Sequence, residues 1–203
     1  MKVIVMKFPG EALSAPQILS ELGETASFFE VRDEAMDVYH GADSVESYVY
    51  LQLPPTDGGD SETKGLQALC QTLHAALEPG HPEIEVAWMK KTLDVAGHSA
   101  GKTGAWHYVV ETDVLPAAED DFNDWYASEH LPGLAAVPGT IRAMRYVCDD
   151  ATPKYYAAYD LETRETFGSE PWLRVRGTEW SSRVRPNFIN TKRTMFKKAS
   201  GSL

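Results

Sequence analysis

The histidine at position 130 is the residue whose type and position best suit chemistry. It lies in the stretch Asp120–Arg145, beside two aromatic residues, Trp125 and Tyr126, and a carboxylate, Glu129. Imidazole titrates near neutral pH, so His130 could act as a general base or acid. Glu129 could orient that ring or take a proton, and the aromatic pair could form the wall of a substrate pocket. The structural alternative is a histidine that caps a helix, an exposed glutamate and two core aromatic residues.

A second candidate base lies on a predicted strand, residues 106–114. His107 and Glu111 share one face of that strand, and a more apolar set of residues occupies the other face. The apolar face should contact helices, so His107 and Glu111 are expected to face a cavity between two sheets. His107 is therefore a candidate catalytic residue and Glu111 a candidate substrate-binding residue. A hydrogen-bonded structural histidine is the alternative.

Arginines supply a third set of candidates. On the predicted strand 140–148, Arg142 and Met144 alternate with Ala143 and Arg145, so one of the two arginines is expected to face the cavity. Arg142 and Met144 are taken as substrate-binding candidates, because an inward arginine suits a carboxylate or enolate oxygen. Helical spacing and acidic neighbours indicate a solvated face for another basic group, which comprises Arg174, Arg176, Arg183 and Arg185.

The helix that should carry His130 is predicted from residue spacing. Phe122, Tyr126 and His130 recur every four residues, as on one face of a helix. Acidic residues occupy its first turns, where negative charge suits the helix dipole. Pro132 disfavours helical geometry in the residue before it, so the helix is predicted to end near His130. A turn and the strand 140–148 follow.

Hydrophobic periodicity predicts two successive units with the element order βαββαβ. The first has predicted strands at 2–8, 28–32, 48–53 and 84–93, and the second at 106–114, 140–148, 155–161 and 190–197. Predicted helices or broken helical regions lie at 14–22, 61–77, 120–130 and 167–184, and a Gly-rich linker covers 94–104. The fold class is therefore α+β, with two tandem ferredoxin-like units packed sheet to sheet as an intrachain α+β barrel. Residues 1–98 form the predicted N-terminal unit, and residues 99–203 form the C-terminal unit.

Composition limits the classes of partner. The 203 residues carry a net charge of −11, which argues against nucleic acid or an anionic membrane as partner. Two cysteines, Cys70 and Cys148, are too few for a disulfide framework, and no segment approaches the length of a membrane span. We therefore expect a cytoplasmic protein with a small-molecule partner, and the sequence leaves a homodimer open.

No residue spacing typical of a metal or cofactor site occurs. HExxH, CxxC, calcium-loop and dinucleotide patterns are all missing from the sequence. The run Ala96–Thr103 is similar to a relaxed phosphate loop, but such a loop leads into a helix, and this one leads into a predicted strand. We therefore predict a linker here, no metal site and no bound cofactor.

The second half of the chain resembles a known family. The run FNDWYASEHLPGLAAVPGTIRAMRY and the later GTEWSSRVRPNFINTKRTMF are similar to the dimeric α+β-barrel superfamily, and more narrowly to its EthD-like branch with a WYxxEHLPxLxxVPG-type motif. The resemblance covers roughly residues 105–197. It implies a pocket between two ferredoxin-like sheets. Members of the superfamily include polyketide cyclases, cofactor-independent monooxygenases, lactone isomerases and haem enzymes.

Three classes of function fit these observations. The preferred one is a cofactor-independent enzyme that acts by general acid/base proton transfer on a small, mostly apolar carbonyl or aromatic (polyketide-like) compound. It could be a cyclase, isomerase, decarboxylase or other lyase, or monooxygenase, because each reaction makes or quenches a carbanion or enolate. The alternatives are a haem- or small-ligand-binding protein and a non-catalytic structural protein. For the enzyme, a near-neutral pKa is expected at His130, because aromatic neighbours lower the pKa and the helix dipole raises it.

Overall fold

The computed structural model describes residues 1–29, 31–54 and 60–199. These residues form a mixed α+β fold, as predicted. Eight antiparallel strands are hydrogen bonded in the closed barrel order β1-β3-β2-β8-β5-β7-β6-β4, and β4 pairs with β1.

The chain divides into two compact units. Unit 1 comprises Met1–Lys90 with Lys197–Leu203, and unit 2 comprises Lys91–Phe196. Two strands, β4 (Glu85–Ala96) and β8 (Phe188–Lys198), contribute residues to both units. A boundary between separable domains at residues 98 and 99 stays a prediction.

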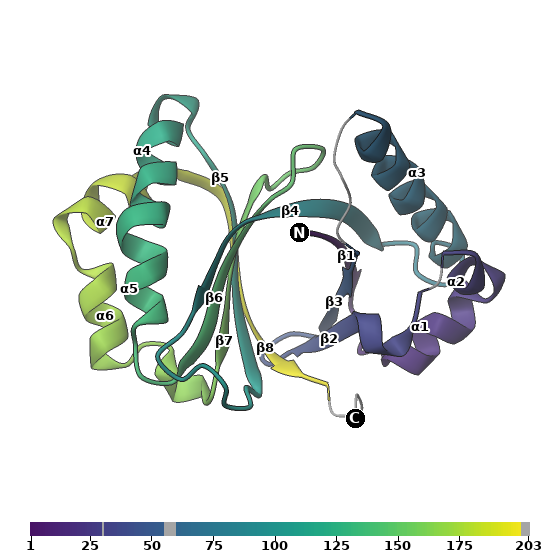
Figure 1. Ribbon diagram of the computed structural model, residues 1–203, viewed down its shortest axis with the longest axis horizontal. Helices are drawn as coiled ribbons and strands as arrows, with labels where there is room; N and C mark the ends of the chain where they lie inside the picture. The colour runs from purple at the N-terminus through teal and green to yellow at the C-terminus, as the bar shows by residue number, and fades with distance from the viewer. Residues whose placement is uncertain (30, 55–59, 200–203) are drawn as a thin grey trace. The chain divides into compact units, whose positions relative to one another are not determined.

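Unit 1 places its helices on one face of its strands (Figure 1). The strands are β1 (Lys2–Pro9), β2 (Met36–Gly41) and β3 (Glu46–Gln52), with the unit 1 part of β4; the helices are α1 (Ala15–Leu22), α2 (Glu24–Phe28), η1 (Asp33–Ala35) and α3 (Asp60–Leu77). Ile4, Ile18 and Leu73, from β1, α1 and α3, are completely buried in the core between these layers. Burial of such side chains is the main stabilising contribution.

The predicted strand at residues 28–32 is wrong. Helix α2 ends at Phe28, and the second strand of the unit is Met36–Gly41. Val31 is buried in the unit 1 core from an irregular segment, so its β-branched side chain reflects packing and not strand geometry. Residue 30 of the predicted strand lies outside the described residues.

Unit 2 also places its helices on one face of its strands (Figure 1). The strands are β5 (Trp106–Val114), β6 (Thr140–Val147) and β7 (Tyr155–Leu161), with the unit 2 parts of β4 and β8. The helical segments are η2 (Pro116–Ala118), α4 (Glu119–Trp125), η3 (Tyr126–His130), α5 (Leu131–Ala135), η4 (Arg164–Thr166), α6 (Glu170–Arg176), α7 (Glu179–Val184) and η5 (Arg185–Asn187). Val109 of β5 pairs with Ala158 of β7, which fixes the register of the central strands.

The helix that carries His130 does not end there, contrary to the prediction. Its chain widens into one π-helical turn, η3, and then continues as α5. The backbone N–H of Leu131 donates to the carbonyl of Tyr126, five residues earlier. Pro132 then occupies the first turn of α5, where its missing N–H is tolerated. Wide turns of this kind recur at functional sites, and this one carries Tyr126 and His130.

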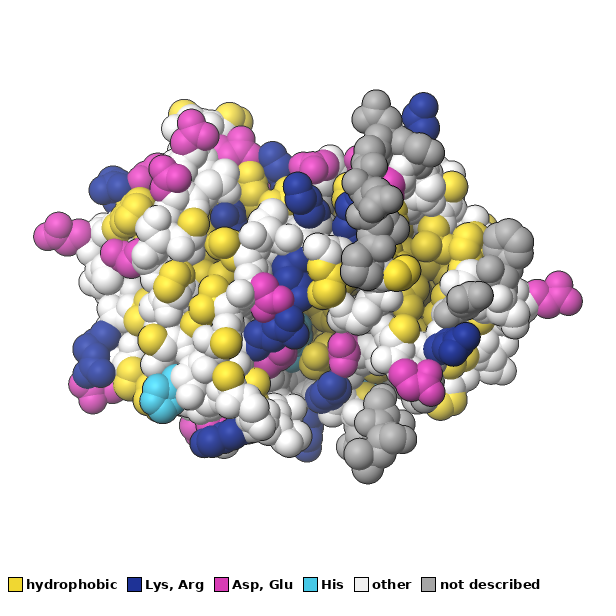
Figure 2. Space-filling model, viewed as in Figure 1, with side chains coloured by type: hydrophobic (Ala, Val, Ile, Leu, Met, Phe, Trp, Pro, Cys, Tyr) yellow, Lys and Arg dark blue, Asp and Glu magenta, His cyan; other side chains and the backbone are white. Residues whose placement is uncertain are grey.

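The surface shows the mixture of charges that the composition implies. Figure 2 shows acidic and basic side chains interspersed over the face in view, with hydrophobic side chains among them. Within the described ranges, no helix has both the length and the apolar character that a membrane span requires.

Candidate functional site

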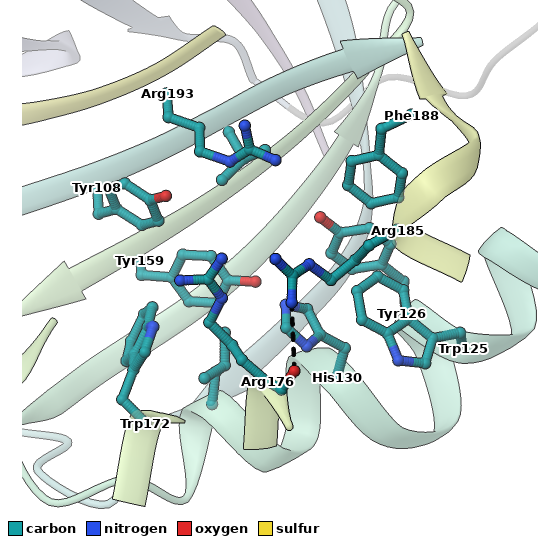
Figure 3. Close-up of a pocket in the computed structure, with 12 residues that line it drawn as sticks. Tyr108, Trp125, Tyr126, His130, Tyr159, Trp172, Arg176, Arg185, Phe188 and Arg193 are labelled. Carbon is teal, nitrogen blue, oxygen red and sulfur yellow. Dashed lines mark hydrogen bonds between the residues drawn. The ribbon is translucent and has the colours of Figure 1, made fainter. Parts of the chain in front are cut away.

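Unit 2 encloses a small cavity between its helices and the helix-facing side of its strands. The cavity has a volume of about 30 Å³. Aromatic residues form most of its wall, namely Tyr108, Trp125, Tyr126, Tyr159, Trp172 and Phe188, while Arg176, Arg185, Arg193 and His130 supply its charged and titratable groups (Figure 3). Of the described residues that line the cavity, none is an aspartate or a glutamate. All of the residues that line this cavity belong to unit 2, and a cavity between the two sheets with His130 at its border or mouth stays a prediction.

The alternation along β5 explains how the strand contributes to the cavity. Tyr108 faces the helices, as the sequence predicted for this face, and its ring contacts Trp172 of α6 in an edge arrangement at 6.1 Å. Tyr159 of β7 pairs with Tyr108 across the sheet and lies 5.3 Å from the Trp172 ring. The three rings thus form one aromatic wall, against which a flat ligand could pack.

His130 lies inside an aromatic cluster at the opposite wall. Its ring stacks on Trp125 with 4.0 Å between centroids and 20° between planes, and it meets Tyr126 edge-on at 5.3 Å. The residue is only 7% exposed, and its Nδ1 atom has no hydrogen-bond partner among the described residues. Trp125 and Tyr126 thus form a wall beside the imidazole, and their predicted role in substrate binding stays a prediction.

The electrostatic environment of His130 differs from the expected one. Burial lowers the pKa of His130 to about 3, and the positive charges of Arg176 and Arg185 act in the same direction. The predicted near-neutral pKa is therefore wrong. Burial is the largest cause, and two arginines from later in the chain, which the sequence argument did not place here, add to it. The imidazole is neutral at pH 7.

Glu129 does not hydrogen bond to His130, contrary to the prediction. Its Oε1 atom accepts hydrogen bonds from Trp125 Nε1 at 3.2 Å and from Thr178 Oγ1 at 2.6 Å. Thr178 also caps α7, because its Oγ1 accepts from the backbone N–H of Ser181. Glu129 therefore holds the indole of Trp125 in place and connects the η3 turn to the start of α7.

Two of the arginines that sequence spacing assigned to a solvated face instead line the cavity. Arg176 and Arg185 are half-buried, and Arg185 Nη1 donates to the carbonyl of Arg176 at 3.3 Å, the dashed line in Figure 3. Burial lowers the pKa of Arg185, and so do the charges of Arg176 and Arg193. Arg174, on the same helix, is exposed and pairs with Glu170 at 2.7 Å. The spacing of Trp172 and Arg176, four residues apart, was a usable signal that both face inward.

The tyrosine hydroxyls of the cavity stay protonated at neutral pH. Burial raises the pKa of Tyr126 to about 12, and burial also raises the pKa values of Tyr108 and Tyr159. The hydroxyl of Tyr159 and the Nε1 atom of Trp172 are buried without a hydrogen-bond partner in the described residues. The cavity therefore presents N–H and O–H donors that the protein itself leaves unused.

His107 and Glu111 lie on the other face of β5 and do not line the cavity. His107 is buried and hydrogen bonds through Nδ1 to Asp160 Oδ1 at 2.7 Å, and its ring lies 6.4 Å from Phe196. Glu111 is also buried. The structure does not bring His107 or Glu111 together with His130. The predicted catalytic residues His130, His107 and Glu129 therefore do not form one site.

The two substrate-binding candidates on β6 have local structural contacts. Arg142 is exposed and pairs with Asp94, with 2.7 Å from its Nε to Oδ1. Hydrogen bonding to Arg142 lowers the pKa of Asp94 to about 2. Met144 is buried, and its sulfur accepts a hydrogen bond from the hydroxyl of Tyr146 at 3.2 Å. Arg142 therefore does not point inward as predicted.

Arg145 is the arginine of β6 that points toward the helices. Its guanidinium carbon lies 4.5–4.9 Å from the ring centres of Phe122, Tyr126 and Tyr155, and Nη2 donates to Asn123 at 2.7 Å. Contacts with aromatic faces stabilise a desolvated cation. The three aromatic rings and Asn123 explain why Arg145 can be buried. Arg145 is not among the residues that line the His130 cavity.

Sequence comparison and structure comparison give different results. No family model matches the chain, and no curated protein matches it in sequence. Solved structures do match. A candidate monooxygenase from Fusobacterium nucleatum subsp. nucleatum has a TM-score of 0.60 at 12% identity over 100% of this chain and 95% of its own.

Two further solved structures also match the chain over almost its whole length. An anthrone oxidase-like protein has a TM-score of 0.60 at 13% identity and covers 98% of this chain and 91% of its own. A heme-degrading enzyme from Listeria monocytogenes has a TM-score of 0.54 at 9% identity over 98% of this chain and 100% of its own. At these identities the likeness shows a shared ferredoxin-like α+β-barrel fold.

Proposed function

We propose that the cavity of unit 2 is the active site of an enzyme that acts by proton transfer on a small carbonyl or aromatic compound, without a cofactor. The observation that carries the proposal is geometric: His130 lines the cavity, and its buried Nδ1 atom has no hydrogen-bond partner in the described residues. A titratable group that lines a cavity and has a strongly perturbed pKa is a candidate functional residue. The names of the neighbours, which include monooxygenases and an anthrone oxidase-like protein, support an enzyme of this kind.

The proposed step is the removal of a proton from a carbon next to a carbonyl. The neutral imidazole of His130 takes the proton, and the electron pair of the C–H bond becomes an enolate. The positive charges of Arg176 and Arg185, which disfavour the imidazolium, stabilise the enolate oxygen in the same step. Cyclases, isomerases, lyases and cofactor-independent monooxygenases differ in what the enolate does next. A place in the EthD-like branch is part of this proposal and rests on the WYxxEHLP run alone.

The cavity volume requires movement of side chains before a substrate enters. About 30 Å³ corresponds to one water molecule, whereas sites for small organic ligands usually measure about 300–1,000 Å³. Arg193 is exposed and Arg176 and Arg185 are half-buried, so these long side chains can move outward. The aromatic wall of Tyr108 and Trp172 would then receive the ring system.

Deuterium exchange at the acidic carbon of anthrone tests the shared first step. We expect the protein to accelerate exchange, and His130→Asn to slow it by roughly 10²-fold or more, because general acid–base catalysis contributes that much. The rate is measured by NMR in D₂O. The matched control is His98→Asn, which changes an exposed histidine of the same unit and should leave the rate unchanged.

The comparison of exchange rates between wild type and His130→Asn tests whether His130 is the base. Equal exchange by wild type and His130→Asn, with both folded by near-ultraviolet circular dichroism, would remove His130 as the base. If exchange is confirmed, an oxygen electrode identifies the next step. A monooxygenase would consume one O₂ per anthrone and form anthraquinone and water, whereas an isomerase would consume none.

Haem is the second candidate ligand, because one structural neighbour is a heme-degrading enzyme. The residues fit only in part. His130 offers a nitrogen without a partner in the described residues, but a cavity of about 30 Å³ is roughly ten times too small for such a macrocycle. We expect the purified protein to show no haem, flavin or nicotinamide absorbance and no stoichiometric metal. A Soret band in its visible spectrum would contradict that expectation.

A further inference from the structure

We infer that the cavity recognises an oxyanion, the carboxylate or enolate oxygen of a planar aromatic ligand. This inference rests on the proposed function and names its substrate class. Arg176, Arg185 and Arg193 come from three different elements, α6, η5 and β8, and converge on one cavity (Figure 3). Buried or half-buried cations normally have a carboxylate partner, and no carboxylate is found among the described lining residues.

Other arginines of unit 2 have partners that stabilise their positive charge. Arg174 pairs with Glu170 at 2.7 Å, and Arg183 pairs with Asp121 at 2.7 Å. Arg145 is compensated by three aromatic rings and Asn123 instead. In contrast, the charged groups that act on Arg185 within the described part of the chain are Arg176 and Arg193, and both add to burial in lowering its pKa. An anion between these guanidinium groups would replace mutual repulsion by charge-assisted hydrogen bonds.

The neutral polar groups of the cavity point to the same kind of ligand. Tyr159 has a buried hydroxyl and Trp172 a buried indole N–H, and neither has a partner in the described part of the chain. An unsatisfied buried donor costs about 1–3 kcal/mol, so such groups usually mark a missing partner. Indole N–H can only donate, and so can guanidinium. The excess of donors selects a ligand whose buried atoms accept hydrogen bonds.

Cavity size and wall chemistry define the rest of the ligand. A space of about 30 Å³ holds about one water molecule, so the part that is already formed receives one oxygen of the anionic head group. The aromatic wall of Tyr108, Tyr159 and Trp172 favours an aromatic body over an aliphatic one.

Paired titrations of 2-naphthoate and 2-naphthamide test this inference by isothermal calorimetry at pH 7. The two probes have the same ring and differ in charge. We expect naphthoate to bind at least tenfold more tightly than naphthamide. Arg176→Gln should weaken naphthoate binding at least tenfold and should leave naphthamide binding nearly unchanged. Arg174→Gln is the matched control, because it removes an equal charge two residues away on the same helix, and it should bind naphthoate like wild type.

Arg193→Gln is the second variant, because this exposed arginine can be replaced without affecting the core. It should also weaken naphthoate binding. Equal affinity for the two probes, no naphthoate binding up to millimolar concentration, or equal effects of Arg176→Gln and Arg174→Gln would each overturn the inference. His130-dependent exchange of anthrone without naphthoate binding would refute the inference and leave the proposed function standing. Arginine-dependent naphthoate binding without exchange would do the reverse.

Discussion

Lowering the pH from 7 to 5 should reduce the free energy of unfolding of the wild-type protein by about 2 kcal/mol more than that of His130→Asn. In the folded protein, burial holds the pKa of His130 at about 3, and its ordinary value is 6.5. Below pH 6.5 the unfolded chain therefore binds a proton that the folded chain excludes. The stability is fully present above pH 6.5 and is lost as the pH falls toward 3, by about 1.4 kcal/mol per pH unit.

Urea unfolding of both proteins at pH 7 and pH 5 measures this difference. His98→Asn serves as the control and should follow the wild-type pH dependence, because that histidine is exposed. The groups that face His130 are Trp125, Tyr126, Arg176 and Arg185. Indole has no titratable group, burial raises the pKa of Tyr126 to about 12, and arginine side chains are in general protonated throughout this pH range. A His130→Asn variant with the wild-type pH dependence would show that the imidazole is solvated in the folded state.

The contribution of His81, in unit 1, to the free energy of unfolding should depend on pH in the opposite direction. Burial alone would lower the pKa of His81, but hydrogen bonds to Glu11 and Glu21 raise it above 6.5. Its contribution to stability is therefore present below pH 6.5 and is lost as the pH rises through the raised value. The pH window of the His130 effect is thus separable from that of His81.

Gly97→Ala should destabilise the protein by roughly 3 kcal/mol, near the upper end of the overpacking range. A Cβ atom at Gly97 would lie 2.1 Å from the carbonyl oxygen of Thr140 and 2.6 Å from its carbonyl carbon. These are backbone atoms, so the two segments must separate. The backbone hydrogen bond from Gly97 to Ile141, at 2.8 Å, would then be lost. Chemical denaturation at pH 7 measures the change.

Gly65→Ala is the matched control. Gly65 lies within α3, and a Cβ atom there meets nothing within 4 Å. Alanine has the higher helix propensity, so this variant should be more stable by about 0.5–1 kcal/mol. Gly97→Ala with wild-type stability would show that Gly97 and Thr140 do not approach closely. The result also bears on the run Ala96–Thr103, which leads into β5 as the sequence predicted for a linker.

The fold was more predictable than the site. Alternation along residues 106–114 correctly placed Tyr108 toward the helices, because a strand buried on one face repeats every two residues. Spacing also placed Tyr126 and His130 on one turn of helical structure. The π-helical turn was not predictable, because Pro132 normally indicates a helix end and only the bond from Leu131 to Tyr126 shows that the chain continues.

The charges of the site could not be read from local patterns. Arg176, Arg185 and Arg193 lie on separate elements, and only tertiary packing brings them over His130. Sequence reasoning also did not predict how completely His130 is buried, and burial is the largest cause of its lowered pKa. Exposed and inward arginines also alternate on α6, where Arg174 and Arg176 differ in environment although they are two residues apart. Composition alone does not distinguish the two.

The sharing of β4 and β8 between the units limits how the gene could be divided. A fragment that begins at residue 99 would lack Lys91–Ala96, the stretch of β4 that belongs to unit 2 and lies next to β6. The freed edge of β6 would expose unpaired N–H and C=O groups, which favour aggregation. A fragment that ends at residue 98 would likewise lack Ala199, whose N–H donates to Val38 in unit 1. The two halves are therefore not interchangeable modules, and a recombination point between them would have to carry both shared strands.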